Sequence, residues 1–107
     1  MAIPNQLENV KVDLKANVYF DGKVVSHTIW IDAKTKKTVG LIYPGTYSFN
    51  TDAPERMDIV AGNCRVKLAG ENAAKDFKAG TFFDVPGKSS FEISVDGGLC
   101  EYLCSFL

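Results

Sequence analysis

Apolar and polar residues alternate along most of this chain. Tyr47, Phe49 and Thr51, for example, are separated by Ser48 and Asn50. A period of two with one apolar face is typical of half-buried antiparallel strands. The same alternation recurs at residues 10–14, 57–59, 64–68, 91–95 and 100–106. The pattern therefore predicts an all-β fold of about eight short strands.

Glycine and proline residues divide these segments from one another. Residues 71–79 are compatible with a helix and fit a hairpin loop equally well. Short strands with turns at this spacing favour a β-sandwich, a jelly roll or a small barrel. The pairs that are typical of turns are Asp21-Gly22, Pro44-Gly45, Gly62-Asn63, Ala69-Gly70, Pro86-Gly87 and Gly97-Gly98.

A closed β-fold has a consequence for the alternating residues. One parity of each strand points into the barrel, so Tyr47, Phe49 and Thr51 are expected to point the same way. The interior would then be partly aromatic and partly hydroxylic. Such an interior suits a ligand cavity as well as a filled core.

Length and charge limit the kind of protein. The 107 residues suffice for one domain, 1–107, and are too few for two domains with cores of their own. Twelve basic side chains against 13 acidic ones give a net charge of −1, so a basic footprint for nucleic acid is absent. No apolar run approaches the roughly 20 residues of a membrane span. We therefore expect no nucleic acid and no membrane as partners.

The N-terminal residues and the cysteines point to a compartment. Residues 1–12 have neither the basic nor the apolar region of a signal peptide. Cys64, Cys100 and Cys104 are odd in number and contain no C-x-x-C pair, unlike a disulfide framework. We expect a cytoplasmic protein whose three thiols are buried as small apolar side chains.

Glu55 is the most informative candidate for chemistry. It lies seven residues before Gly62, and Gly80 precedes the turn at Pro86; both spacings are similar to those of cupin jelly rolls. Metal-binding cupins carry histidines before that glutamate and after that turn, whereas the single histidine here, His27, lies elsewhere. One imidazole and one carboxylate are too few ligands for a transition metal, so no bound metal is expected.

Two interpretations of Glu55 stay open at this point. In one, the carboxylate pairs with an arginine or caps a turn. In the other, it faces a cavity as an acceptor for sugar hydroxyls or as an acid/base group. His27 lies in a strand-like stretch without a nucleophile motif, and we expect it to be structural or exposed.

Candidate anion-binding groups are few. The turn at residues 86–90 offers backbone N–H groups together with Lys88 and Ser89, although a solvated hairpin turn has the same sequence features. Strand parity points Arg56 out of its own barrel, toward solvent or a neighbouring subunit. The basic run at residues 34–37 is expected to be a solvated loop.

Several segments taken together resemble one small bacterial cupin family. The central segment contains a Tyr-x-Phe-x-Thr core at Tyr47, Phe49 and Thr51. The matching segments are residues 17–24, 39–51, 53–57 with Gly62, 79–86, 90–91 and 102–104. The family they resemble is that of the pyrimidine/purine nucleoside phosphorylases, and the resemblance spans residues 17–107.

The resemblance implies a cupin-like jelly roll and a pentosyltransferase of broad specificity. Members convert a purine or pyrimidine nucleoside and phosphate to the free base and ribose 1-phosphate. Phosphate is a co-substrate, and no cofactor is implied. The chain departs from the family at Arg56, where an acidic residue can occur, and in the 71–78 loop, where Phe77 is the aromatic residue nearest to a missing tryptophan. Residues 1–15 extend beyond shorter members.

The roles of individual residues follow from the chemistry of the N-glycosidic bond. Its cleavage develops positive charge on the sugar and negative charge on the base. We expect Glu55 to accept hydrogen bonds from ribose hydroxyls and to stabilise the cationic sugar. Tyr47 and Thr51 are the other catalytic candidates, through hydrogen bonds from the cavity wall. The candidates for substrate binding are Tyr102, through its hydroxyl, and Phe49, Met57 and Phe83, through packing against the base. Those for phosphate are Lys88, Ser89 and Arg56.

Two other classes of function are compatible with these residues. One is a non-enzymatic cupin that binds a small molecule, which phosphate-dependent turnover would distinguish from an enzyme. The other, a metal-dependent cupin oxygenase or isomerase, is disfavoured by the missing histidines. Because edge strands need cover, we expect a homodimer, with residues 1–16 as an N-terminal extension that forms a strand on the barrel or on a partner subunit.

Overall fold

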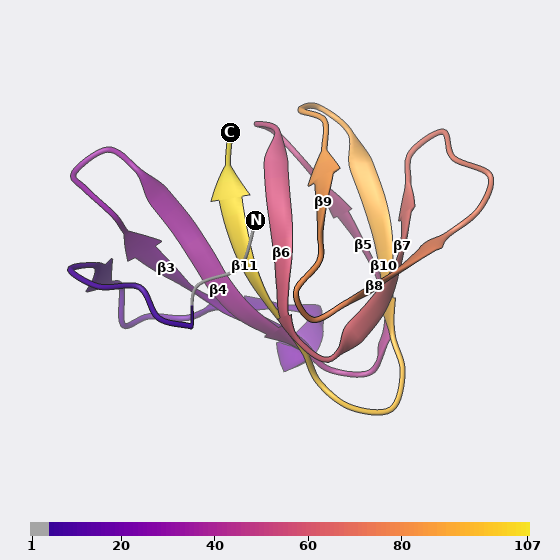
Figure 1. The fold of residues 1–107 in the computed structure, drawn as a ribbon, viewed down its shortest axis with the longest axis horizontal. Helices are drawn as coiled ribbons and strands as arrows, with labels where there is room; N and C mark the ends of the chain where they lie inside the picture. Colours follow the sequence, from indigo (N-terminus) through magenta and orange to yellow (C-terminus); the bar gives the residue numbers. More distant parts are fainter. Residues whose placement is uncertain (1–4) are drawn as a thin grey trace.

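The computed structural model describes residues 5–107, which form two antiparallel β-sheets that face each other (Figure 1). The larger sheet has the order β1-β3-β4-β11-β6-β9, with β2 beside β3, and the smaller has the order β5-β10-β7-β8. The strands of the larger sheet are β1 (Lys11–Val12), β2 (Asn17–Tyr19), β3 (Val24–Trp30), β4 (Lys36–Ile42), β6 (Glu55–Ala61), β9 (Phe82–Val85) and β11 (Cys100–Phe106). Those of the smaller sheet are β5 (Gly45–Asn50), β7 (Asn63–Leu68), β8 (Lys75–Lys78) and β10 (Ser90–Val95).

The all-β prediction is confirmed, and the predicted turns fall where strands change direction. The turns at Pro44, Gly62, Ala69, Pro86 and Gly97 connect consecutive strands, and the pair Asp21-Gly22 lies in the short 3₁₀ helix η1 (Phe20–Gly22). Residues 71–79 form a loop followed by β8, so the helical alternative for this stretch is wrong. No helix within residues 5–107 is long and apolar enough to cross a membrane.

The core lies between the inner faces of the two sheets. Phe83 from the larger sheet and Phe91 from the smaller meet edge-to-face, with ring centroids 5.7 Å apart. All three cysteines are buried, as expected. Cys64 on β7 meets Cys100 on β11 across the core, and hydrogen bonding to Cys100 together with burial raises the pKa of the Cys64 thiol. These contacts fix the separation of the two sheets.

The basic run at residues 34–37 differs from its prediction as a solvated loop. The Asp32 carboxylate accepts hydrogen bonds from the backbone N–H groups of Lys34 and Thr35, at 2.8 and 2.9 Å. This Asx-type turn closes the loop at residue 35, so β4 begins with Lys36. Two of the four residues therefore belong to a strand, and their side chains point to opposite faces of the sheet.

The described part of the N-terminal extension lies on the chain's own barrel. Strand β1 pairs with β3 at the edge of the larger sheet. The indole Nε1 of Trp30 donates to the Asp13 carboxylate at 3.2 Å, and the His27 ring nitrogen Nδ1 lies 3.1 Å from the Asp13 carbonyl oxygen. His27 thus has the structural position expected of it. Residues 1–4 of the predicted extension lie outside the described residues.

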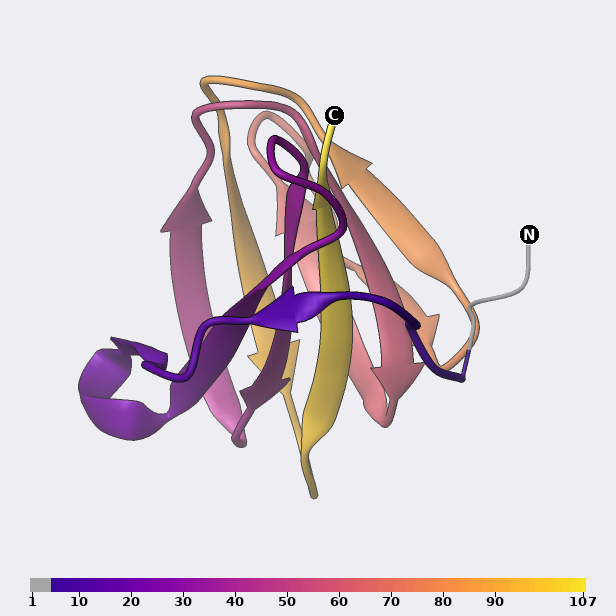
Figure 2. The same cartoon turned by 90° about the vertical axis from the view of Figure 1, so that its left-hand side faces the viewer.

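Three chain segments gather at one end of the molecule. Both views show the C-terminus, the β5–β6 connection and the β9–β10 connection together at the top (Figures 1 and 2). Backbone hydrogen bonds join them: Leu107 N–H donates to the Pro54 carbonyl at 2.8 Å, and Lys88 N–H donates to that of Asp52 at 3.1 Å. The strands that enter or leave this end include β4, β6 and β11.

Candidate active site

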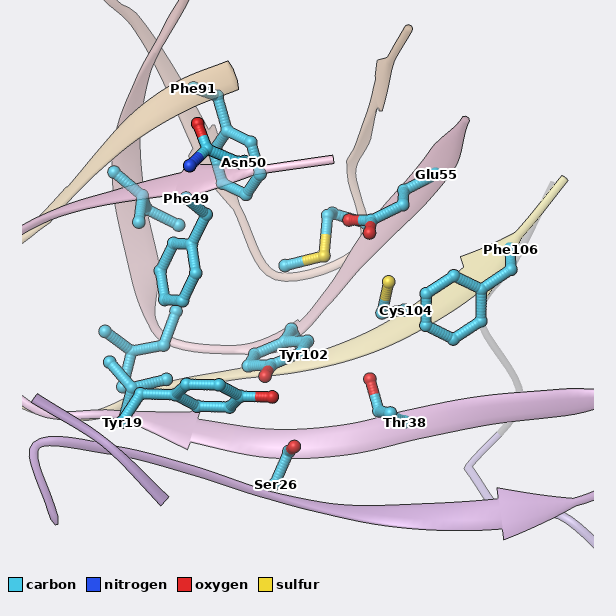
Figure 3. Close-up of a pocket in the computed structure, with 14 residues that line it drawn as sticks. Tyr19, Ser26, Thr38, Phe49, Asn50, Glu55, Phe91, Tyr102, Cys104 and Phe106 are labelled. Carbon is cyan, nitrogen blue, oxygen red and sulfur yellow. The ribbon is translucent and has the colours of Figure 1, made fainter. Parts of the chain in front are cut away.

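A cavity of about 220 Å³ lies between the sheets (Figure 3). The larger sheet provides most of its polar side chains and the smaller sheet provides aromatic ones. The polar lining consists of Tyr19, Ser26, Thr38, Asn50, Glu55, Tyr102 and Cys104, and the apolar lining includes Phe49, Met57, Phe91 and Phe106. Four of the residues predicted for the site, Glu55, Phe49, Met57 and Tyr102, therefore surround one cavity.

The register of β6 and β11 explains why these side chains share the cavity. Met57 lies opposite Cys104, and Glu55 lies opposite Phe106. Residues two apart on one strand point to the same face, so each pair lines the cavity one step further toward the C-terminal end of β11. The alternation that predicted the strands therefore also places these groups on the inner face.

Glu55 begins β6 and is half-buried. Burial raises the pKa of the Glu55 carboxyl group, and the hydrogen bond from the Cys104 thiol partly opposes that shift. Within residues 5–107 Glu55 makes no ion pair: Arg56 pairs with Asp84, and the other arginine also pairs elsewhere. The interpretation of Glu55 as the partner of an arginine is therefore wrong. The carboxylate instead points toward the interior, near Cys104 (Figure 3).

Cys104 supports this carboxylate and is not itself a reactive thiolate. Burial and the neighbouring Glu55 raise the pKa of Cys104 to about 12. The thiol stays protonated at neutral pH and donates its hydrogen bond to Glu55. Nucleophilic attack requires the thiolate, so the chemistry of this pair lies on the carboxylate.

Tyr102 lies in the middle of the inner face, on top of Gly40. The two residues are paired across β11 and β4. A Cβ atom at position 40 would lie 2.6 Å from the Tyr102 ring, so only glycine leaves room for it. Burial raises the pKa of the Tyr102 hydroxyl, which hydrogen-bonds with Ser26. Asn17 Nδ2 in turn donates to Ser26 Oγ at 3.3 Å, which fixes this polar wall.

Aromatic rings form the opposite wall. Phe49 stacks on Phe91 with centroids 5.6 Å apart, and Tyr19 meets Phe49 edge-on at 6.0 Å. Phe20 also meets Phe49 edge-to-face, with centroids 5.4 Å apart. Phe20 and Asp21 both have positive φ, 52° and 56°, which is rare for an aromatic residue. This strained turn directly follows Tyr19, which lines the cavity from the end of β2.

Tyr47 and Phe83 are placed differently from their prediction as cavity residues. The Tyr47 hydroxyl donates to the carbonyl oxygens of Tyr43 and Pro44, at 2.9 and 3.0 Å, and so braces the turn before β5. The Phe83 ring packs in the core, 5.0 Å from that of Phe77. Both side chains point inward, as strand parity predicted, but they pack in the core and do not line the cavity.

Thr51 is a structural bridge in this fold and does not line the cavity. Its hydroxyl donates to the Pro86 carbonyl at 2.6 Å and accepts from the Ser89 N–H at 3.0 Å. These bonds use the backbone N–H of Ser89, and that of Lys88 is used by Asp52. The 86–90 turn therefore lacks the two N–H groups that an anion nest at these positions requires.

Replacing Thr51 by valine is expected to lower stability and spare the reaction. The change removes two part-buried hydrogen bonds, to the Pro86 carbonyl and from the Ser89 N–H, which together contribute about 1–3 kcal/mol. Urea unfolding measures that loss, while kcat and KM stay within about twofold of the wild-type values. Thr51→Ser keeps both hydrogen bonds and serves as the control. A large fall in kcat of Thr51→Val at unchanged stability would instead indicate that Thr51 is catalytic.

Arg56 faces away from the cavity, as its parity predicted. Its Nε lies 2.8 Å from Oδ1 of Asp84, and its guanidinium lies over the Phe82 ring at 4.2 Å. Hydrogen bonding to this guanidinium lowers the pKa of Asp84. Arg56 is thus held on the outer face, away from the cavity of its own chain.

Several cavity residues were absent from the sequence prediction. Cys104 and Phe106 follow Tyr102 at intervals of two, so the same alternation could have included them. Ser26 and Thr38 are small polar residues on β3 and β4, and only strand pairing brings them next to Tyr102. Among residues 5–107, no group of three or more His, Cys, Asp or Glu side chains is placed to hold a metal ion.

Comparison with known proteins identifies the family. The model of the family described as pyrimidine/purine nucleoside phosphorylase matches residues 14–106. This chain belongs to that family. A pyrimidine/purine nucleoside phosphorylase from Thiobacillus denitrificans is 56% identical over 102 residues, which cover 95% of this chain and 98% of that protein. One from Burkholderia vietnamiensis is 50% identical over the full length of both chains.

Solved structures share the fold of this chain. A protein of unknown function from Acinetobacter sp. ADP1 superimposes with a TM-score of 0.92 at 43% identity, covering 95% of this chain and 98% of that one. A cupin-2 domain protein from Shewanella frigidimarina has a TM-score of 0.61 at 11% identity, covering 74% and 76%. The second likeness shows the fold alone. This chain thus has a cupin-like jelly-roll fold, as the sequence predicted.

Proposed function

We propose that this chain catalyses phosphorolysis of purine and pyrimidine nucleosides with broad specificity, as a pentosyltransferase that uses phosphate as co-substrate. The bond between C1′ and the base breaks, its electron pair leaves with the base, and the base takes up a proton. A phosphate oxygen forms the new bond to C1′. The observation that supports this most is the Glu55 carboxylate, which has no ion-pair partner within residues 5–107 and lies beside a cavity with hydroxyl and aromatic walls.

Each wall of the cavity suits one part of a nucleoside. Glu55 accepts hydrogen bonds from the ribose hydroxyls and stabilises the positive charge that develops on the sugar. Tyr102, Ser26 and Thr38 offer hydroxyl groups along the same wall. Phe49 offers a ring face to the base, and since every base has a π-face, such packing tolerates both purines and pyrimidines.

Free base released with and without phosphate tests the proposal. Pure protein is incubated with inosine, uridine or adenosine, and the base is followed by chromatography. Release that requires phosphate supports phosphorolysis. Equal release without phosphate identifies a hydrolase, and no release with any nucleoside favours a cupin that binds small molecules without catalysis.

We also propose that the protein acts as a cytoplasmic homodimer. The three cysteines are unpaired, which is typical of reducing compartments. Val18, Val39 and Phe82 are exposed on the outer face of the larger sheet, where a second copy would cover them. Light scattering coupled to gel filtration gives the mass, and a monomer at micromolar concentration contradicts the dimer.

A further inference from the structure

Lys36 lies on the inner face of the larger sheet, close to the cavity. It begins β4 two residues before Thr38, which lines the cavity, so the two side chains point to the same face. Ser105 lies opposite Lys37, and the next pair in that register joins Lys36 to Phe106. On its other side Phe106 lies opposite Glu55. Lys36, Phe106 and Glu55 therefore form one row across three neighbouring strands.

The Lys36 ammonium group is held near the cavity without a carboxylate partner. Its Nζ lies 5.6 Å from the centroid of the Phe106 ring. A cation over an aromatic ring is weakly attracted to it, and its N–H donors remain directed away from the ring. The ion pairs within residues 5–107 involve Arg56, Arg65 and Lys75, and none involves Lys36. An exposed, unpaired ammonium group at this position is available to an anion.

Other basic residues are less well placed for the same task. Arg56 is bound to Asp84 on the outer face. Lys37 follows Lys36 on β4 and points to the outer face. Lys11 also points to the inner face, but it lies on the edge strand β1, where it pairs with Trp30 of β3. Strand β1 is two strands further from Glu55 than the strand that carries Lys36. Lys36 is thus the basic side chain of β4 that points to the face carrying Glu55.

The size of the cavity indicates where phosphate must go. Its volume of about 220 Å³ is below the ~300–1,000 Å³ of typical small-molecule sites, so we do not expect it to enclose a nucleoside and a phosphate together. Phe106 is 37% exposed and Asn50 is exposed, so the cavity meets solvent at this end. Strand spacing of about 4.8 Å puts Lys36 two strands, or about 10 Å, from Glu55, which a lysine side chain and a phosphate together span.

We propose that Lys36 binds the phosphate co-substrate at the mouth of the cavity and directs it toward the sugar held by Glu55. This inference rests on the proposed phosphorolysis. The ammonium group acts as a point charge with three donors, a common way to bind phosphate. It also offsets the repulsion between the phosphate and the Glu55 carboxylate.

Separate measurement of KM for phosphate and for nucleoside tests Lys36. Lys36→Met is expected to raise the KM for phosphate at least about tenfold, as loss of a charged hydrogen bond does, while the KM for uridine stays within about twofold. Lys36→Arg restores most of the phosphate affinity. Lys37→Met is the matched control, because it removes the same charge from the opposite face, and its kinetics stay like those of the wild type. Circular dichroism checks folding.

The outcomes separate this inference from the proposed function. An unchanged KM for phosphate in folded Lys36→Met, with phosphate-dependent turnover in the wild type, overturns the role of Lys36 and leaves phosphorolysis standing. A wild-type enzyme without phosphate-dependent turnover overturns the proposed function itself. Equal changes in both KM values, or the same loss in Lys37→Met, show a structural or general electrostatic effect and also contradict the inference.

Discussion

Replacing Glu55 by glutamine is expected to lower kcat at least about tenfold without loss of stability. Glutamine keeps the size of the side chain and removes the negative charge that we propose stabilises the cationic sugar in the transition state. Because burial raises the pKa of Glu55, the ionised form opposes folding at neutral pH. The variant should therefore have a Tm at pH 7 equal to or above that of the wild type, as is common when a functional charge is removed.

Glu101→Gln is the matched control for this prediction. Glu101 is exposed on the same strand as Cys104, and its parity directs it to the outer face of the sheet. Its removal should leave kcat within about twofold of the wild-type value. Full activity in folded Glu55→Gln would contradict the assigned role, and equal losses in both variants would indicate a general effect of charge.

The pH profile adds an independent check on the same carboxylate. The folded-state pKa of Glu55 is raised, so its active, ionised form is lost as pH falls through a value above that of an ordinary glutamate. The thiol of Cys104, which faces it from β11, stays neutral in this range. The kcat/KM of the wild type should therefore decline on the acid side, and this limb should disappear in Glu55→Gln. Ionised Glu55 lowers the free energy of unfolding. That loss disappears once the pH is below the pKa of Glu55 in the unfolded chain, because the carboxyl group is then protonated in both states.

Replacing Gly40 by alanine is expected to disrupt both stability and activity. The added Cβ would lie 2.6 Å from Cζ of Tyr102, so the ring must move from its place over β4. Overpacking of this kind costs about 1–3 kcal/mol. Displacement of Tyr102 also disturbs its contact with Ser26, and we expect kcat/KM to fall about tenfold or more.

The same Gly40→Ala change, made in a Tyr102→Leu variant, shows whether the Tyr102 ring causes the loss of stability. The backbone of Gly40 has no positive φ, so alanine suits the strand once the ring is shortened. In Tyr102→Leu, the Gly40→Ala change should be neutral or stabilise the fold by up to about 1 kcal/mol, because glycine weakens a strand relative to alanine. Urea unfolding of the four proteins gives the coupling between the positions. Equal costs in both backgrounds would contradict the steric explanation.

The local sequence pattern predicted the parts of this site that depend on strand parity. Phe49, Met57 and Tyr102 point inward because a period of two is a local property of each strand. The prediction for Thr51 failed because its partners, Pro86 and Ser89, are brought to it by the pairing of β5 with β10. Bonds between residues that are 35 or 38 positions apart leave no mark on the alternation of either segment.

The positions of Lys36 and Tyr47 depend on turn chemistry that the alternation does not contain. Lys36 belongs to a strand because the Asp32 carboxylate closes the preceding turn at Thr35. The Tyr47 hydroxyl donates to the Pro44 carbonyl in the turn before β5, so this inward-pointing side chain lies in the core and not in the cavity. Parity thus predicted which face each side chain occupies, whereas turns and strand pairing decide which side chains meet in the cavity.

Formation of ribose 1-phosphate tests the central claim most directly. Wild-type protein is incubated with uridine and inorganic phosphate, the sugar phosphate is quantified by ³¹P NMR, and uracil is measured in the same sample. Phosphorolysis in this cavity predicts one ribose 1-phosphate for each uracil released, and both products should fall together in Glu55→Gln. Uracil released with free ribose, or no product from uridine and other nucleosides, would contradict the claim.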